Sequence, residues 1–192
     1  MKSDVIQHIF SHIPTLKTER LILRPMRVED CFDMYDYARR VDVTKYLTWS
    51  PHINLEQTKE YLKFIKKHYR VGDFYDWAVV VVDENKMIGT CGFTRFHCEH
   101  DCAEVGYVLN PNYHGKGYAT EAVTRVLDFG FDDLLLNRIE AKYMMGNDAS
   151  RRVMEKCGMR FEGVRRGEML VKGSYRDIGV CAVLRSDRKK KE

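Results

Sequence analysis

The sequence predicts one domain of the α/β (α+β) class, with about seven strands and helices between them. The chain has 192 residues, which is enough for one well-filled core and only marginally enough for two domains. Hydrophobic residues make up 44% and charged residues 31%, a balance typical of a globular protein. Strand-like and helix-like segments alternate over a core of about residues 16–185, without repeats or a credible linker. We therefore expect residues 1–192 to form a single domain, with a short N-terminal extension and a basic C-terminal tail.

The first part of the chain predicts a strand and two helices. Thr18–Arg27 alternates apolar and polar residues and contains Pro25, which is typical of a strand near a sheet edge. Glu29–Arg40 and Leu55–Arg70 have the apolar spacing of helices. The stretch Asp42–Asn54 between them is irregular and rich in aromatic residues. It predicts either a loop that caps the core or a substrate-facing loop, in which three residues are candidates for acceptor binding: Tyr46, Trp49 and His52.

The middle of the chain predicts a hairpin and then a strand, a loop and a helix. Tyr75–Val82 and Lys86–Phe96 are strand-like runs separated by a short turn, so they predict a hairpin. Ala103–Leu109 predicts a further strand, which an Asn-Pro pair ends. A glycine-rich loop follows it and leads into a predicted helix at Thr120–Phe131.

The last part of the chain predicts three strands and one helix. Asn147 or Asp148 can cap a helix that runs to Cys157, and Gly158 stands where a C-terminal cap glycine belongs. The last two strands form a hairpin through a turn at residues 172–174, and the three strands are Asn137–Met144, Phe161–Val171 and Tyr175–Leu184.

Composition and charge bear on location and partners. No apolar run approaches the roughly 18 residues that span a bilayer, and His8 and His12 interrupt the segment where a signal peptide would be apolar. We therefore expect a cytoplasmic protein, no membrane partner, and free thiols for its six cysteines. The net charge of +4 is modest and comes partly from the tail Arg188–Lys191, a pattern typical of a solvated chain end. Nucleic acid is not an expected partner.

The strongest functional signal lies at residues 107–120, where a strand leads through Tyr-Val-Leu-Asn-Pro-Asn-Tyr-His-Gly-Lys-Gly-Tyr-Ala-Thr into a helix. Amides at a helix start are unpaired and carry the positive end of the helix dipole, so they suit a pyrophosphate. Gly115 and Gly117 let the backbone approach such a group. An ordinary strand-to-helix turn is the alternative, since neither the Walker A string nor the dinucleotide fingerprint occurs.

The residues of this loop resemble those of one enzyme family. Asn112–Gly117 is similar to the Gln/Arg-x-x-Gly-x-Gly/Ala coenzyme A loop of the GNAT acetyltransferases, with Asn112 in place of the usual Gln or Arg. Asn147–Ser150 and Val153–Met159 resemble the later motif of that family. Two more segments resemble the ribosomal-protein N-acetyltransferases typified by RimJ and RimL: Thr18–Pro25 and Ile88–Gly92. The resemblance extends from about residue 18 to residue 184.

This resemblance implies a mixed, mostly antiparallel sheet flanked by helices and splayed between the fourth and fifth strands. It implies acetyl-CoA as the acetyl donor and no metal. The pantetheine arm would pair with the fourth strand, and an amide near Val108 would face the thioester oxygen. The coenzyme site that it implies consists of Tyr107, Val108, Leu109, Asn112, His114, Gly115, Lys116, Gly117, Tyr118, Ala119, Thr120, Asn147 and Ser150.

The resemblance also suggests catalytic residues. Acetylation of a charged amine requires a base, and Glu104 stands near where some relatives place a carboxylate, although it can equally be a paired surface group. Many relatives use a Tyr as the acid, but here that position is Met154. Ser150 matches a serine that is a proposed proton donor in RimL-type members, or it bonds the helix backbone. Tyr143 is a further hydroxyl, in a setting typical of a core aromatic.

Three functions remain open from the sequence. The leading one is acetylation of a protein N-terminal α-amine, such as that of a ribosomal protein, by a monomer or homodimer. The second is acetylation of a small amine such as a polyamine or an aminoglycoside, and the third is a non-catalytic acetyl-CoA-binding module, which Met154 would allow. The segment His97–Cys102 contains zinc-type side chains, but no second Cys/His pair with structural-site spacing occurs, so we expect no metal.

Overall fold

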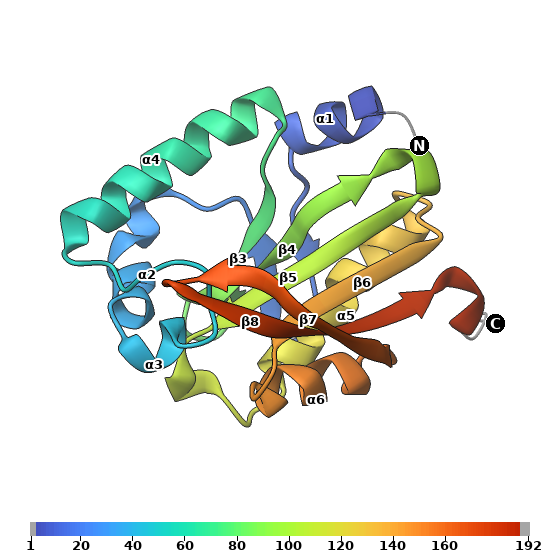
Figure 1. Ribbon diagram of the computed structural model, residues 1–192. Coiled ribbons are helices and arrows are strands. Elements are labelled where there is room, and N and C mark those ends of the chain that lie inside the picture. The colour runs from blue at the N-terminus through green and yellow to red at the C-terminus, as the bar shows by residue number, and fades with distance from the viewer. Residues whose placement is uncertain (1–2, 189–192) are drawn as a thin grey trace.

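The computed structural model describes residues 3–188, which form one eight-stranded sheet with helices around it (Figure 1). The helices are α1 (Ser3–Ser11), α2 (Cys31–Ala38), α3 (Val41–Thr44), α4 (Leu55–Val71), α5 (Tyr118–Asp132) and α6 (Asp148–Lys156). The strands are β1 (Leu16–Lys17), β2 (Leu21–Arg24), β3 (Tyr75–Val81), β4 (Lys86–His97), β5 (Cys102–Leu109), β6 (Arg138–Met144), β7 (Arg160–Val171) and β8 (Ser174–Leu184).

The sheet is mixed and mostly antiparallel, as predicted, in the order β1-β2-β3-β4-β5-β6-β8-β7. β5 and β6 form its parallel pair, and their pairing ends at Val105 opposite Ala141. β5 continues to Leu109 and β6 to Met144, so the two strands separate beyond this point. The splay that was predicted between the fourth and fifth strands is therefore present, and in the numbering of the structure it lies between β5 and β6.

The predicted first strand Thr18–Arg27 differs from the structure. Two strands occur there, β1 and β2, because the Thr18 hydroxyl accepts from the amide of Leu21 at 2.9 Å and closes a tight turn between them. This turn accounts for eight strands instead of about seven. Residues after Arg24 leave the sheet, since the Arg24 guanidinium pairs with Asp30 at 2.6 Å at the start of the following helix.

The N-terminal segment is part of the core. We expected only a short extension before residue 16, but α1 buries Ile6 and Phe10. The ring of Phe10 lies 5.5 Å from that of Trp77 and 6.3 Å from that of Phe129, so α1 joins β3 to α5. Burial of such an aromatic side chain contributes roughly 2–3 kcal/mol to folding.

The two faces of the sheet carry different helices. In Figure 1, α5 lies behind the sheet, whereas α2 and α4 pack together at the left. Gly130 of α5 sits against the side chains of Phe93 and Ile139, and a Cβ there would come within 2.6 Å of Ile139. On β5, the buried side chains of Ala103 and Val105 lie on this α5 face. Glu104 between them therefore points to the opposite face, because side chains alternate along a strand.

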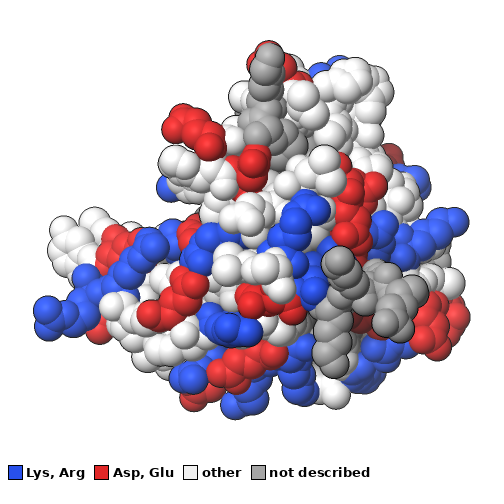
Figure 2. Space-filling model, turned by 90° about the vertical axis from the view of Figure 1, so that its right-hand side faces the viewer, with Lys and Arg blue, Asp and Glu red and all other residues white. Residues whose placement is uncertain are grey.

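The surface of the molecule carries charges of both signs, and the last described residue is paired. On the face shown in Figure 2, basic and acidic side chains are interspersed. Arg188 is paired with Asp128 and Asp132, each at 2.5 Å, so the predicted solvated tail does not include it. Lys189–Lys191 lie outside the described residues. Within residues 3–188, no helix is both long and apolar enough to cross a membrane.

Candidate active site

A cavity of about 580 Å³ opens where β5 ends and α5 begins. This size suits a ligand much larger than a metal ion or a water molecule. Eleven of the thirteen predicted coenzyme residues line it: Tyr107, Val108, Leu109, His114, Gly115, Gly117, Tyr118, Ala119, Thr120, Asn147 and Ser150. Asn112 and Lys116 do not. Other lining residues were not predicted: Asp42, Val43, Leu47, Pro111, Tyr113, Ala149, Arg152, Val153 and Lys156.

The loop before α5 presents free amides to the cavity. Gly115 and Gly117 have φ values of +77° and +83°, a backbone region that favours glycine. A Cβ at Gly115 would meet no atom within 4 Å, so this backbone faces open space. In the described part of the chain, the amides of residues 115–120 donate to no other group. Together with the positive end of α5, they suit a ligand with phosphate groups.

The open edge of β5 forms the second wall. Residues 106–109 of β5 pair with β4 on one side, but beyond Val105 no strand within residues 3–188 pairs with them on the β6 side. Their free backbone groups can pair with an extended ligand as a further strand would. Loop and strand edge together accommodate a ligand with an anionic end and an amide-containing arm.

Two hydroxyl groups meet at the bottom of this cavity. Asn147 caps α6 by accepting from the amide of Ser150 at 3.2 Å, as the sequence predicts for one of two candidate caps. The Tyr107 hydroxyl lies 2.8 Å from the carbonyl oxygen of Ser150 and 2.9 Å from its Oγ. Burial raises the pKa of Tyr107, so this phenol stays protonated at neutral pH. The sequence did not identify this pair, because the two residues are 43 positions apart.

Neither Met154 nor Tyr143 offers an alternative acid. Met154, at the position of the tyrosine in many relatives, is buried in the core. Tyr143 is also buried and does not line the cavity, and a Cβ on Gly179 would come within 2.4 Å of its ring. Within the described chain its hydroxyl has no hydrogen-bond partner.

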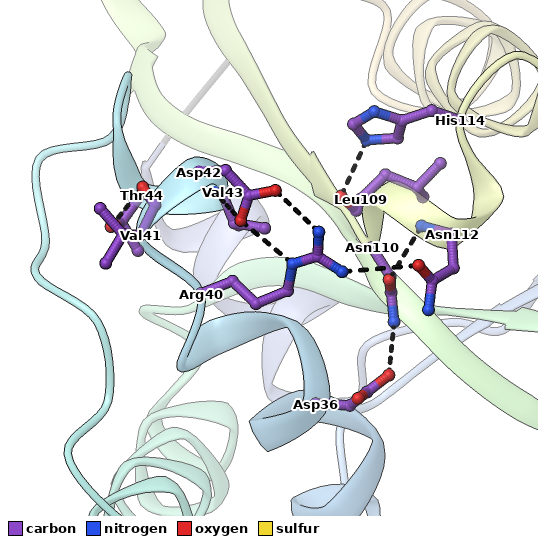
Figure 3. A network of polar contacts seen from close by, with 10 residues as sticks. All are labelled: Asp36, Arg40, Val41, Asp42, Val43, Thr44, Leu109, Asn110, Asn112 and His114. Carbon is purple, nitrogen blue, oxygen red and sulfur yellow. Dashed lines mark hydrogen bonds and ion pairs between the residues drawn. The ribbon is translucent and has the colours of Figure 1, made fainter.

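A polar network supports the loop from the side of α2 and α3 (Figure 3). The Asn110 side chain accepts from the amide of Asn112 at 3.1 Å and donates to Asp36 at 2.9 Å. The Arg40 guanidinium donates to Asn112 Oδ1 at 3.4 Å and pairs with Asp42 at 2.7 Å. Asn112, which replaces the family's long side chain, therefore faces Arg40 and not the cavity (Figure 3).

Glu104 lies outside the cavity, on the face opposite α5. Its Oε2 is 3.0 Å from the Lys142 ammonium, and its Oε1 accepts from the Thr94 hydroxyl at 3.0 Å. It stands three residues before Tyr107 on the same strand, which corresponds to a rise of roughly 10 Å. Glu104 is therefore a paired carboxylate, which was one of its two interpretations from the sequence. To act on a ligand in the splay, it would need the acceptor or a water molecule between its carboxylate and that ligand.

A second carboxylate, Asp76, occupies the same sheet face. Burial raises the pKa of Asp76 to about 7, although Thr90 and the Trp77 amide donate hydrogen bonds to it. Among residues 3–188, no Lys, Arg or His nitrogen lies within 4.0 Å of it. Gly92 lies opposite Asp76 and Gly106 lies opposite Gly92, so neither of the next two residues in this row has a side chain, although that of Thr94 lies over Gly106. We call the sheet face that carries Asp76 and Glu104 the carboxylate face.

The three aromatic candidates for acceptor binding separate in the structure. Tyr46 lines the cavity, and its hydroxyl would lie 3.6 Å from a Cβ on Gly146. Trp49 and His52 do not line it, and the centroids of their mutually tilted rings lie 5.6 Å apart. His52 also bonds Thr58 at 2.8 Å, and burial lowers the pKa of this histidine. These two residues thus connect the loop to α4.

The segment His97–Cys102 forms the turn between β4 and β5. Over residues 3–188, no group of three or more His, Cys, Asp or Glu side chains is arranged to hold a metal ion. None of the six cysteines, all within this range, is in a disulfide.

The comparisons with known proteins agree on one family. The family described as acetyltransferase (GNAT) domain has a sequence model that matches residues 20–160. The uncharacterized N-acetyltransferase p20 of Bacillus licheniformis is 35% identical over 173 residues, which cover 90% of this chain and 97% of that protein. The crystal structure of an acetyltransferase (GNAT family) from Bacillus anthracis has a TM-score of 0.80 and 33% identity, over 90% of this chain and 99% of its own.

Two further relatives have named acceptors. The spermidine N(1)-acetyltransferase of Vibrio cholerae is 26% identical, over 87% of this chain and 94% of its own. The ribosomal protein uS5-alanine N-acetyltransferase of Escherichia coli is also 26% identical, over 92% of this chain and 95% of its own. The two acceptors differ in size, and equal identity does not favour either one.

Proposed function

This chain is an N-acetyltransferase of the GNAT family, and we propose that it transfers the acetyl group of acetyl-CoA to a primary amine, foremost the α-amine of a protein N-terminus. The observation that carries the proposal is the cavity in which free loop amides meet the open edge of β5. The amides suit the pyrophosphate and the strand edge suits the pantetheine amides. Residues of the chain therefore fit both ends of acetyl-CoA.

When bound, acetyl-CoA supplies an activated acetyl group and leaves as the thiol. The chain has to hold it, exclude water and move two protons. An ammonium acceptor must lose a proton before it attacks. Glu104 is our candidate base, acting through the acceptor or a water, and Lys142 and Thr94 orient its carboxylate.

Ser150 is our candidate proton donor to the departing sulfur. The Tyr107 hydroxyl donates to the Ser150 carbonyl oxygen at 2.8 Å and lies 2.9 Å from Ser150 Oγ. The serine hydroxyl can therefore donate to Tyr107 at rest and turn its proton toward a sulfur in the cavity that both residues line. The carboxylate face and the hydroxyl pair lie on opposite faces of β5, because side chains alternate along a strand. The base would thus act on the acceptor side and the acid on the thiol side.

The leading acceptor follows the relative that acts on ribosomal protein uS5 and the resemblance of Thr18–Pro25 to that branch. One observation favours a second candidate, a small amine with more than one ammonium group. Asp76 is a half-buried acid without a cationic partner in the described chain, and the two residues that follow it in its row, Gly92 and Gly106, are glycines. A second ammonium would neutralise it.

Intact-mass measurement of one added acetyl group tests the proposal. Purified protein and acetyl-CoA are incubated with a panel of peptide N-termini, diamines, polyamines and monoamines. We expect single acetylation of at least one N-terminal peptide, at a rate above that without enzyme. Acetylation of polyamines alone would select the second candidate. Coenzyme binding without transfer to any amine would contradict both and leave a binding module.

A further inference from the structure

The turn between β1 and β2 contacts the coenzyme loop from outside the cavity. The Arg20 guanidinium donates to the carbonyl oxygen of Lys116 at 3.0 Å and to Glu121 of α5 at 2.7 Å. Its central carbon lies 4.5 Å above the ring of Tyr118, the first residue of α5. Thr18 completes the contact with a bond from its hydroxyl to Glu121 at 2.6 Å. One turn thus contacts the loop, the helix start and the first helical turn.

The position of this turn is set by the sheet. Leu16 pairs with Leu23 across β1 and β2, and the carbonyl of Arg20 accepts from the amide of Val82 at 3.0 Å. The Thr18 hydroxyl accepts from the amide of Leu21 at 2.9 Å. Because these bonds tie the turn to β2 and to the end of β3, Arg20 extends from a rigid base.

Hydrogen bonds of Asn110 and His114 support the first half of the loop, but residues 115–117 have little other support. Its amides must remain unpaired to bind a pyrophosphate, so they cannot also stabilise the loop. Gly115 and Gly117 lose more conformational freedom on ordering than other residues do. A bond to the Lys116 carbonyl oxygen orders the loop from the opposite side without using any of these amides.

From these contacts we propose that Arg20 is a positioning residue that pre-orders the pyrophosphate loop, an inference that rests on the coenzyme part of the proposed function. A loop ordered before binding loses less entropy when the ligand arrives, so affinity rises. Arg20 does not line the cavity and acts through Lys116 and Gly117. A Cβ on Gly117 would lie 3.4 Å from its Nη2, which shows how closely it approaches this backbone.

Arg20 also neutralises an acid beside the anion site. Burial by itself raises the pKa of Glu121, but bonds from Thr18 and from the backbone and side chain of Arg20 outweigh it and lower that pKa. Glu121 is therefore ionised in the first turn of α5, where an unpaired charge would repel a pyrophosphate. The same guanidinium therefore reduces this repulsion through its bond to Glu121 and orders the loop through its bond to the Lys116 carbonyl oxygen.

The test compares Arg20→Ala, Arg20→Lys, Arg20→Ala/Glu121→Gln and the control Arg125→Ala, which lies one turn further along α5. Calorimetry measures the Kd of acetyl-CoA, and hydrogen exchange without ligand follows the bonded amides that flank the loop, those of Tyr113, His114 and Glu121. Activity with S-acetylpantetheine, which lacks the pyrophosphate, supplies a third measurement. Arg20→Lys keeps the charge but cannot make the same forked contact. Circular dichroism checks that each variant is folded. If Arg20→Ala does not fold, the comparison of Arg20→Lys with the wild-type protein serves as the test.

We expect Arg20→Ala to raise the Kd of acetyl-CoA about tenfold and Arg20→Lys to raise it about fivefold. Both should speed loop exchange and leave kcat/KM for S-acetylpantetheine within about twofold. The double variant should recover part of the affinity, since it removes the exposed acid. Wild-type affinity and exchange in Arg20→Lys, or an equal loss with S-acetylpantetheine, would overturn the inference. If the wild-type protein fails to bind acetyl-CoA, the proposed function fails instead.

Discussion

The proposed coenzyme cavity and the carboxylate face lie on the same strand, β5, but are built from different groups. The cavity presents main-chain amides and a strand edge, which the chain shapes with glycines and a helix start. The carboxylate face presents side-chain charges, Asp76 and Glu104, from strands that are distant in the sequence. The first region resists change because its groups belong to the backbone, whereas the second can be altered one side chain at a time.

If the two regions have the proposed roles, this difference would allow relatives to differ in acceptor. Spermidine and a ribosomal protein are acceptors of two relatives that are equally identical to this chain. A fold of this kind keeps its donor site and varies the side chains that face the acceptor. The following predictions test whether the two regions are separable, from the largest expected effect to the smallest.

Gly117→Asp should have the largest effect and should act on coenzyme binding alone. Its φ of +83° disfavours a side chain, and a carboxylate there would repel phosphates. We expect calorimetry to show acetyl-CoA affinity reduced by more than about a hundredfold. Gly173→Asp is the matched control, since its φ is +79° and no atom lies within 4 Å of its Cβ position. Unchanged affinity in a folded Gly117→Asp protein would remove the loop from the site.

Glu104→Gln should act on turnover and not on the coenzyme. If the carboxylate is the base, kcat should fall on the order of a hundredfold while the Kd of acetyl-CoA stays near normal. The loss should shrink at high pH, where more of the acceptor amine is already neutral. Glu140→Gln is the control, because Glu140 lies beside Glu104 in the parallel register and pairs with Arg138. Full activity at neutral pH would exclude Glu104 as the base.

Ser150→Ala and Tyr107→Phe should each reduce kcat about tenfold, less than loss of the base, because a water can replace a hydroxyl. Unlike the turnover of the Glu104 variant, that of these two variants should not recover at high pH. They lack a hydroxyl group, and a larger supply of neutral acceptor amine does not replace it. Ser174→Ala and Tyr175→Phe, at the exposed β7-β8 turn, serve as matched controls. A defect relieved by alkali, or none in either variant, would show that the pair does not supply the thiol proton.

Asp76→Asn should give the smallest effect, on stability. The pKa of Asp76 in the folded protein, about 7, is above its ordinary value of 3.8, so its contribution to stability is full at low pH and is lost as the pH rises through 7. Denaturant titrations should show Asp76→Asn gaining about 1–2 kcal/mol relative to wild type between pH 5 and pH 8. Asp83→Asn, on the surface, is the control. A gain independent of pH would mean that Asp76 does not titrate in this range.

Local patterns in the sequence predicted most of the elements and the loop that we propose as the donor half of the site. Apolar periodicity located the hairpins and the long helices, and the glycines before α5 located the loop, because these signals depend on neighbouring residues only. The cap at Asn147 followed from its side chain and the adjacent amides. The helix α1 was missed because its buried residues, Ile6 and Phe10, become core only against distant strands.

The tertiary structure decided which side chains meet. Arg20 bonds to the coenzyme loop, Arg40 faces Asn112, and Tyr107 bonds Ser150, across separations of 43 to 96 residues. Only the strand registers place Asp76 in a row with two glycines on the carboxylate face. Such contacts depend on sheet order and on the packing of helices against it, which no local window of sequence contains. Backbone chemistry was therefore predictable from the sequence, whereas the side-chain partners required the fold.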